Sequence, residues 1–139
     1  MRLGVNLLCA TGFANAAAQA NDYCNLVSHP AFGITYDTFR LHIEEKDQVQ
    51  AVTNLARRVQ VLHVSEDHRR NPESGQIDFP AVFGVVKNTV LDGWSLTEAL
   101  GSGVPELAAA TRILRPMFDG CNTLYSESSR YTKDAWYAA

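Results

Sequence analysis

Four short apolar runs occur along the chain, and each is followed by a segment in which apolar residues recur at helical spacing. The runs cover residues 3–8, 32–37, 59–64 and 93–97. Their length, together with the β-branched and aromatic side chains of the middle two, predicts strands. Alternation of strand and helix predicts an α/β fold with parallel strands. Its functional residues are expected at the carboxyl ends of those strands.

The segments after these runs predict four helices. The first covers residues 15–27 and ends just before a proline-containing turn. The third begins after the N-cap Asp78 and reaches about residue 88, and the fourth runs from Pro105 to about Phe118. The inward faces of the second and third helices are expected to carry Val49, Val52, Leu55 and Ala56, and Val82, Val85 and Val86, respectively.

The composition narrows the class of protein. With 139 residues, of which 46% are apolar and 19% charged, the chain is long enough for one globular domain. A net charge of −3 argues against a nucleic-acid partner. No run approaches the roughly 20 apolar residues of a membrane span, so no membrane partner is expected either.

The cysteines indicate the compartment. Cys9, Cys24 and Cys121 form no CxxC pair, so neither a zinc ribbon nor a redox motif is indicated. A reducing cytoplasm is therefore the expected location. The apolar run at the start of the chain is not assigned to a secretory signal, because Asn6 interrupts it and a single arginine precedes it.

Side chains of metal-ligand type occur at matching places on three successive strands. Asp37 ends the second predicted strand, His63 lies at the end of the third, and Glu98 directly follows the fourth. Taken singly, the aspartate suits a helix cap, the histidine a packed core and the glutamate a solvated surface. Taken together, two carboxylates and an imidazole suit a divalent ion such as Mn²⁺, Mg²⁺ or Co²⁺.

Four segments around these residues resemble motifs of one known family. Residues 37–45 (DTFRLHIEE) resemble the Asp-Thr-Phe-His-Met-Asn-Ile-Glu-Glu signature of the ketose 3-epimerases, the group of D-tagatose and D-psicose 3-epimerases. Residues 63–70 (HVSEDHRR), 75–79 (GQIDF) and 92–98 (DGWSLTE) resemble the segments that follow in that family, at similar spacing. The resemblance covers about residues 10–118.

The resemblance implies a xylose isomerase-like (β/α)8 TIM barrel, of which about four C-terminal βα units are present. Residues 1–120 would form this half-barrel domain and residues 121–139 a C-terminal tail, to which no element is assigned. A full barrel needs about 250 residues, and half a barrel exposes two strand edges. We therefore expect self-association, a missing N-terminal half, or a truncated gene product.

The resemblance also implies an activity, that of a metal-dependent sugar isomerase/epimerase. The reaction would remove a proton next to the carbonyl of a ketose, form an enediolate, and return the proton on the opposite face (3-epimerisation). Asp37, His63 and Glu98 would bind the metal, most readily Mn²⁺, and Glu98 would also be catalytic. Arg69 would bind substrate. Arg40, where the family has a histidine, could hold a sugar hydroxyl or a phosphate.

One part of the family pattern differs in this chain. An ungapped count places Gly4 where the family has its second catalytic carboxylate, and Ala10 where it has a substrate-binding glutamate. Asn6 is the nearest polar side chain, and an amide cannot act as a base. The alternative function is therefore a catalytically impaired or inactive half-barrel that binds metal or sugar only. A phosphodiesterase on the same barrel type is disfavoured, because further histidine and aspartate ligands are lacking. Trp94 is expected to pack in the core.

Overall fold

Four strands form a single parallel sheet in the order β1-β2-β3-β4. The computed structural model describes residues 3–6, 13–89, 92–113 and 115–139. The strands are β1 (Leu3–Asn6), β2 (Phe32–Asp37), β3 (Val59–Val64) and β4 (Trp94–Thr97). The predicted parallel α/β arrangement is confirmed. Residues 7 and 8, which the sequence assigns to the first strand, lie outside the described residues.

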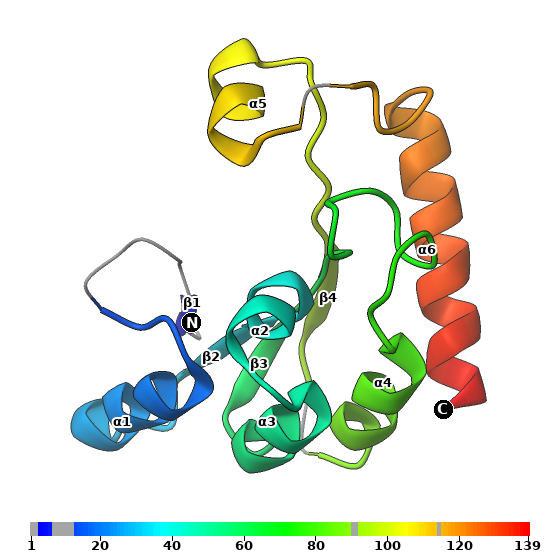
Figure 1. Ribbon diagram of the computed structural model, residues 1–139. Coiled ribbons are helices and arrows are strands. Elements are labelled where there is room, and N and C mark those ends of the chain that lie inside the picture. The colour runs from blue at the N-terminus through cyan, green and yellow to red at the C-terminus, as the bar shows by residue number, and fades with distance from the viewer. Residues whose placement is uncertain (1–2, 7–12, 90–91, 114) are drawn as a thin grey trace.

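One face of the sheet is covered by helices. These are α1 (Ala17–Val27), α3 (Gln48–Leu55) and α4 (Phe79–Lys87), which lie side by side below the sheet in Figure 1. The core between them consists of apolar side chains from both layers, among them Ile34, Tyr36, Leu62, Val64, Val52, Leu55, Phe79, Val82 and Phe83. None of the helices in the described part is long and apolar enough to cross a bilayer.

The helix faces follow the predicted spacing except at Val49 and at Ala56, which is the half-buried C-cap of α3 and lies outside its core face. Val52 and Leu55 of α3 are buried, but Val49 is 36% exposed and Ala51 takes its place in the core. The predicted face was wrong at Val49 because α3 begins at Gln48, so Val49 lies in the first turn at the edge of the packed layer. In α4, Val82 and Val86 are buried and Val85 packs partly against the core, as predicted, and Asp78 is the N-cap.

Two helices were not predicted. The first is α2 (Thr38–Glu44), a short helix that starts directly after β2. The second is α6 (Cys121–Ala138), which occupies the tail left unassigned and runs along α4 (Figure 1). It packs through aromatic rings: Phe79 meets Tyr131 and Phe83 meets Trp136, each pair with ring centroids 5.8 Å apart. Aromatic anchors spaced among polar residues give a weak helical period, so the sequence alone did not reveal α6.

The helix α5 (Pro105–Thr111) is shorter than expected. It stands apart from the other helices, at the top of Figure 1, and ends at Thr111 rather than near Phe118. Arg112 adopts a left-handed conformation (φ 60°) and its backbone N–H donates to the carbonyl groups of Ala108 and Ala109. This conformation ends the helix.

The opposite face of the sheet is open. Trp94 and Leu96 of β4 alternate with residues that face the helices, and they are 76% and 46% exposed. The expectation that Trp94 packs in the core was therefore wrong. In a closed barrel this face points inward and is covered by the remaining strands. The strands β1 and β4 each have a single hydrogen-bonded neighbour among the described residues, as a half-barrel requires.

Candidate metal centre

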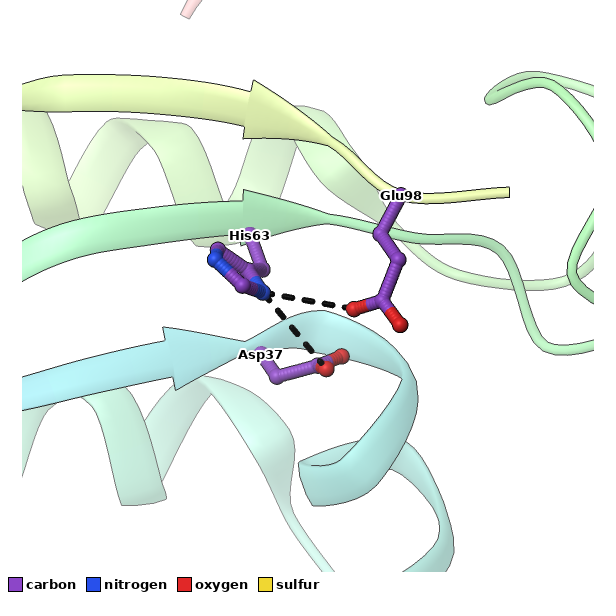
Figure 2. A group of neighbouring side chains, drawn as sticks. All are labelled: Asp37, His63 and Glu98. Atoms are coloured by element: carbon purple, nitrogen blue, oxygen red, sulfur yellow. Dashed lines mark hydrogen bonds and ion pairs between the residues drawn. The ribbon is translucent and has the colours of Figure 1, made fainter. Parts of the chain in front are cut away.

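The three side chains chosen from the sequence meet at the carboxyl end of the sheet. Asp37 and His63 are paired neighbours at the ends of β2 and β3, and the backbone N–H of Glu98 donates to Val64 (3.1 Å) just beyond β4. Their ligand atoms all lie within 4.8 Å of one another. Figure 2 shows His63 between the two carboxylates, with its Nδ1 3.3 Å from Glu98 Oε2 and 4.0 Å from Asp37 Oδ2.

Asp37 has two tasks, one for each oxygen. Its Oδ1 accepts hydrogen bonds from the backbone N–H groups of Phe39 (3.0 Å) and Arg40 (3.3 Å), which caps α2. This cap fixes the side-chain rotamer and leaves Oδ2 facing His63 and Arg69. Asp37 can therefore cap α2 and bind a metal ion at the same time.

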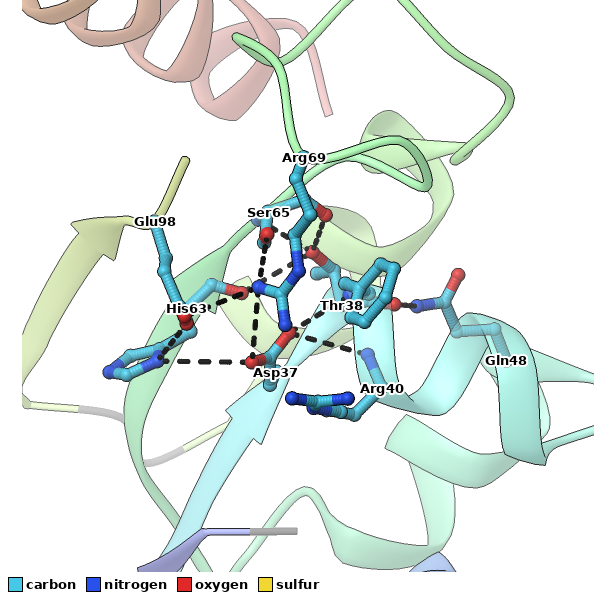
Figure 3. Close-up of polar contacts among 9 residues, drawn as sticks. Asp37, Thr38, Arg40, Gln48, His63, Ser65, Arg69 and Glu98 are labelled. Atoms are coloured by element: carbon cyan, nitrogen blue, oxygen red, sulfur yellow. Dashed lines mark hydrogen bonds and ion pairs between the residues drawn. The ribbon is translucent and has the colours of Figure 1, made fainter. Parts of the chain in front are cut away.

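Thr38 joins β2 to the loop after β3. Its hydroxyl donates to the carbonyl of Ser65 (2.6 Å) and accepts from the Ser65 N–H (2.9 Å), and both residues are buried. Gln48 in turn donates to the Thr38 carbonyl (2.6 Å) (Figure 3). These contacts hold the ends of β2 and β3 at a fixed separation. Sequence reasoning missed this role, and the only signal was the position of Thr38 directly after the strand-end aspartate.

Arg69 reaches into the same cluster from the loop after β3 (Figure 3). Its side chain is buried, with Nη1 2.8 Å from Ser65 Oγ, 3.3 Å from Glu98 Oε1 and 4.0 Å from Asp37 Oδ2. The guanidinium carbon also lies 3.7 Å from the centroid of the Phe39 ring. Arg69 has a left-handed backbone (φ 64°), a conformation that is strained for a non-glycine residue. These contacts set the orientation of the guanidinium.

The loop that carries Arg69 is held by a buried glutamate that the sequence reading did not single out. Glu66 is fully buried, and its Oε1 accepts from the backbone N–H groups of Asp67 (3.1 Å) and Ile77 (3.2 Å). A side chain on Gly75 would collide with Glu66 and Asp67, so a glycine is needed where the loop returns. Glu66 therefore positions the loop.

The ionisable groups of the cluster shift one another's pKa values. The hydrogen bond to Glu98 raises the pKa of His63 above its ordinary value, and the same bond lowers the pKa of Glu98 to about 2. Burial raises the pKa of Asp37, although the nearby Arg69 opposes that effect. Burial likewise lowers the pKa of Arg69. Without a metal, the cluster is a network of two acidic and two basic groups.

The donor set suits a divalent cation. Two carboxylates and one imidazole provide hard and borderline donors, and all three face one point at the rim of the sheet. Asp37 is buried while His63 and Glu98 are partly exposed, so the centre is open to a ligand from the uncovered face of the sheet. A bound cation would take the place of the proton that His63 carries in the ion pair.

The first strand approaches the metal centre through Asn6. Gly4 pairs with Gly33, four positions before the end of β2, whereas Asn6 pairs with Thr35, two positions before Asp37. Paired residues share a face of the sheet, so Asn6 is the described β1 side chain that comes nearest to the metal centre along the strand. Its Oδ1 is buried without a hydrogen-bond partner among the described residues. Gly4, which the ungapped count selected, lies on the same face of β1 two residues earlier. Ala10 lies outside the described residues.

Arg40 lies beside the cluster, on the first turn of α2. It is half-buried and its guanidinium carbon lies 5.1 Å from the centroid of the Phe39 ring, which also contacts Arg69. Both arginines line a cavity next to the metal centre. The structure thus brings together the five residues that the sequence selected: Asp37, His63, Glu98, Arg69 and Arg40.

Residues 2–120 match the family model described as "Xylose isomerase-like TIM barrel". This chain belongs to that family. It is 27% identical over 126 residues to a ketose 3-epimerase of Arthrobacter globiformis, a match that covers 89% of this chain and 44% of the relative. It is 22% identical to an L-ribulose 3-epimerase of Methylomonas sp. (strain DH-1), over 91% of this chain and 45% of the relative. The chain thus spans less than half the length of these relatives.

Solved structures give the same fold. An L-ribulose 3-epimerase structure superposes with a TM-score of 0.89 at 22% identity, covering 99% of this chain and 48% of the other. A D-allulose 3-epimerase from Methylomonas sp. in complex with D-allulose superposes with a TM-score of 0.87 at 20% identity, covering 97% and 48%. The predicted fold, a xylose isomerase-like TIM barrel present as about one half, is confirmed.

Proposed function

We propose that this chain provides the metal-binding side of the active site of a metal-dependent sugar isomerase/epimerase that acts next to the carbonyl of a ketose. The observation that carries the proposal is the convergence of Asp37, His63 and Glu98 within 4.8 Å at the carboxyl end of the sheet. The names of the relatives, ketose 3-epimerase and L-ribulose 3-epimerase, support 3-epimerisation as the reaction.

Asp37, His63 and Glu98 would hold the metal, for which Mn²⁺ is the first choice and Mg²⁺ and Co²⁺ are alternatives. When bound, the metal would act as a Lewis acid that polarises the substrate carbonyl. Asp37 is preset for this role because its cap hydrogen bonds hold the side chain before any ligand arrives.

Proton transfer and substrate binding would be carried out by three side chains. Glu98 is the group that would accept the proton from the substrate carbon, because its carboxylate is ionised at neutral pH and lies at the metal centre. Arg69, held between Ser65 and Glu98, would donate hydrogen bonds to substrate oxygens. Arg40 would be a second substrate-binding group, on the cavity side of the Phe39 ring.

The proposed activity requires a covering for the open face of the sheet. We propose that a second copy of the chain, or an N-terminal half, covers Trp94 and Leu96 and pairs with the edges of β1 and β4. Two copies would supply the eight strands of a closed barrel. A cytoplasmic location also belongs to this proposal, and the free thiols of Cys24 and Cys121 support it.

A second candidate function is a half-barrel that binds metal or sugar without turnover. The observation that favours it is Asn6, an amide on the β1 position nearest the metal centre, where a two-base reaction needs a second ionisable group. In this case metal would stabilise the protein by mass action and no ketose would be converted.

The two candidates are separated by one set of assays. Interconversion of D-fructose, D-tagatose and L-ribulose with their 3-epimers is measured with Mn²⁺, Mg²⁺ or Co²⁺, alongside the metal-dependent shift in melting temperature. We expect turnover in the wild-type chain and none in Glu98→Gln, while the exposed control Glu106→Gln stays active. Stabilisation by metal without turnover, in a chain whose mass in solution shows self-association, would establish the second candidate, and the absence of both effects would refute both.

A further inference from the structure

A cavity of about 730 Å³ adjoins the metal centre at Arg69, which lines the cavity and contacts Glu98. Three parts of the chain form it: the start of α2, the loop after β3, and the segment that follows α5. The side chains that matter for what it can bind are Arg40, Arg69, Arg112, Arg115 and Asp67. The remaining walls are largely apolar and include Phe39, Ile43, Ile113 and Met117.

The cavity is positively charged although the chain as a whole is acidic. Four arginines line it and Asp67 is the single carboxylate among its lining residues, whereas the net charge of the chain is −3. Asp67 Oδ1 is buried without a hydrogen-bond partner among the described residues, 3.5 Å from His68 Nδ1, so this carboxylate offsets part of the positive charge and leaves an excess from the arginines. Clustering of like charges raises the free energy of the folded protein unless an opposite charge binds among them.

The four arginines differ in what they already contact. Arg69 is buried and engaged with Glu98 and Asp37, so it belongs to the metal centre as much as to the cavity. The guanidinium carbons of Arg40 and Arg69 lie 5.1 Å and 3.7 Å from the centroid of the same ring, that of Phe39, so the two cations are close neighbours. Arg112 and Arg115 are exposed and lie on the opposite wall.

The wall that carries Arg112 and Arg115 is anchored. Ile113 and Met117 are 7% and 6% exposed, and Arg70 Nε donates to the Met117 carbonyl (2.6 Å). The Ile113 N–H donates to Ala108, which ties the segment to α5. The two exposed guanidinium groups are therefore held at the cavity mouth by buried neighbours on either side.

The chemistry of the lining selects for an anion. Arginine offers N–H donors and no acceptor, whereas the hydroxyl groups of a neutral sugar both donate and accept. A phosphate or carboxylate is an acceptor-only group that a guanidinium can bind through two parallel hydrogen bonds. With walls that are otherwise apolar, the cavity matches a ligand that carries its charge at one end.

We propose that the substrate is an anionic ketose, whose phosphate or carboxylate lies among Arg40, Arg112 and Arg115 while its carbonyl end meets the metal centre. The inference rests on the proposed function, because the position of the carbonyl end depends on Asp37, His63 and Glu98. It adds a charged substrate class, which the names ketose 3-epimerase and L-ribulose 3-epimerase do not give.

Binding of matched probes tests the proposal. Calorimetric titrations of the Mn²⁺-loaded chain use D-fructose 6-phosphate, D-fructuronate, D-fructose and inorganic phosphate. We expect at least one of the two charged ketoses to bind roughly tenfold or more tightly than D-fructose, with an affinity that falls as NaCl is added. Which charged ketose binds more tightly distinguishes a phosphate from a carboxylate ligand.

Two double variants distinguish the effect of the cavity arginines from the effect of a general loss of positive charge. Arg112→Gln with Arg115→Gln removes the exposed cavity arginines, and Arg57→Gln with Arg130→Gln removes two exposed arginines that do not line it. The first is expected to lose the preference for the charged ketose, and the second to keep it. Equal binding of charged and neutral ketoses, or an unchanged preference in the first variant, would overturn the proposal.

Mn²⁺ affinity, measured separately, keeps this inference distinct from the proposed function. Both double variants are expected to bind Mn²⁺ as the wild type does, because neither changes a proposed ligand. If the wild type binds Mn²⁺ and D-fructose without preferring the charged ketoses, the substrate class is wrong and the proposed function stands. If the wild type binds no metal, the proposed function fails, and with it the placement of the carbonyl end.

Discussion

His63 Nδ1 lies 3.3 Å from Glu98 Oε2, so the same two atoms form an ion pair in the free protein and are the donors proposed for the metal. A proton on His63 and a metal ion at the centre therefore exclude each other. This competition makes both metal affinity and stability depend on pH.

Metal affinity is expected to rise with pH. The hydrogen bond to Glu98 raises the pKa of His63 above its ordinary value of 6.5, so a proton competes with the metal up to a higher pH than it would on a free imidazole. Titrations of Mn²⁺ between about pH 5.5 and pH 8.5 should show affinity increasing steeply and then levelling off once His63 is neutral. The exposed His29→Asn variant should show the same profile. A flat profile would contradict the assignment of His63 as a ligand.

The stability of the metal-free protein is expected to fall as the pH rises above neutrality, whereas metal affinity rises. Protonated His63 contributes stability that is complete below about pH 6.5 and is lost as the pH rises through its raised folded pKa. Glu98 contributes stability above its ordinary pKa of 4.5, which is lost as the pH falls towards its folded pKa of about 2. Urea unfolding should thus show a shallow maximum between these limits, and His63→Asn should flatten it.

Replacing Thr38 with valine should destabilise the protein. The Thr38 hydroxyl serves both the N–H and the carbonyl of Ser65 in a buried place, and valine would leave those groups without a partner. We expect a loss of about 1–3 kcal/mol in the free energy of unfolding. The matched control is Thr53→Val on the exposed face of α3, where the hydroxyl bonds only to its own helix. Equal effects of the two substitutions would show that the link between strands contributes nothing.

Introducing a carboxylate at position 6 should strengthen the metal centre. Asn6 shares a face of the sheet with Thr35 and Asp37, and its Oδ1 has no hydrogen-bond partner among the described residues. Asn6→Asp is nearly isosteric and adds a hard anionic donor, so Mn²⁺ affinity is expected to rise by roughly tenfold. Asn54→Asp, on exposed α3, serves as the control for added charge. Unchanged affinity in Asn6→Asp would place Asn6 outside the metal centre.

The open face of the sheet should associate with a second copy of the chain. Light scattering coupled to size exclusion is expected to give a mass above the 15.3 kDa of one chain, and Trp94→Lys should reduce it. Tyr137→Lys replaces an equally exposed aromatic on α6 and should leave the mass unchanged. A stable monomer at all concentrations would exclude self-association and leave a separate N-terminal half as the covering partner.

The sequence by itself determined the features that depend on short segments. Strand-length runs placed Asp37, His63 and Glu98 at strand ends, and parallel strands bring such ends to one edge of a sheet. The Asp78 cap and the buried positions Val82 and Val86 followed from local periodicity. The resemblance of four segments to motifs of the ketose 3-epimerases implied the barrel family, and the match of residues 2–120 to the family model confirms it.

The tertiary structure decided what depends on residues that are distant along the chain. Strand pairing showed that Asn6, and not Gly4, lies nearest the metal centre on β1, because register is set between strands. Packing against α4 accounts for α6, whose aromatic anchors find their partners across the fold. The exposure of Trp94 and the placement of Arg40, Arg112 and Arg115 around one cavity likewise depend on which elements become neighbours. Short-range patterns carry no information about that.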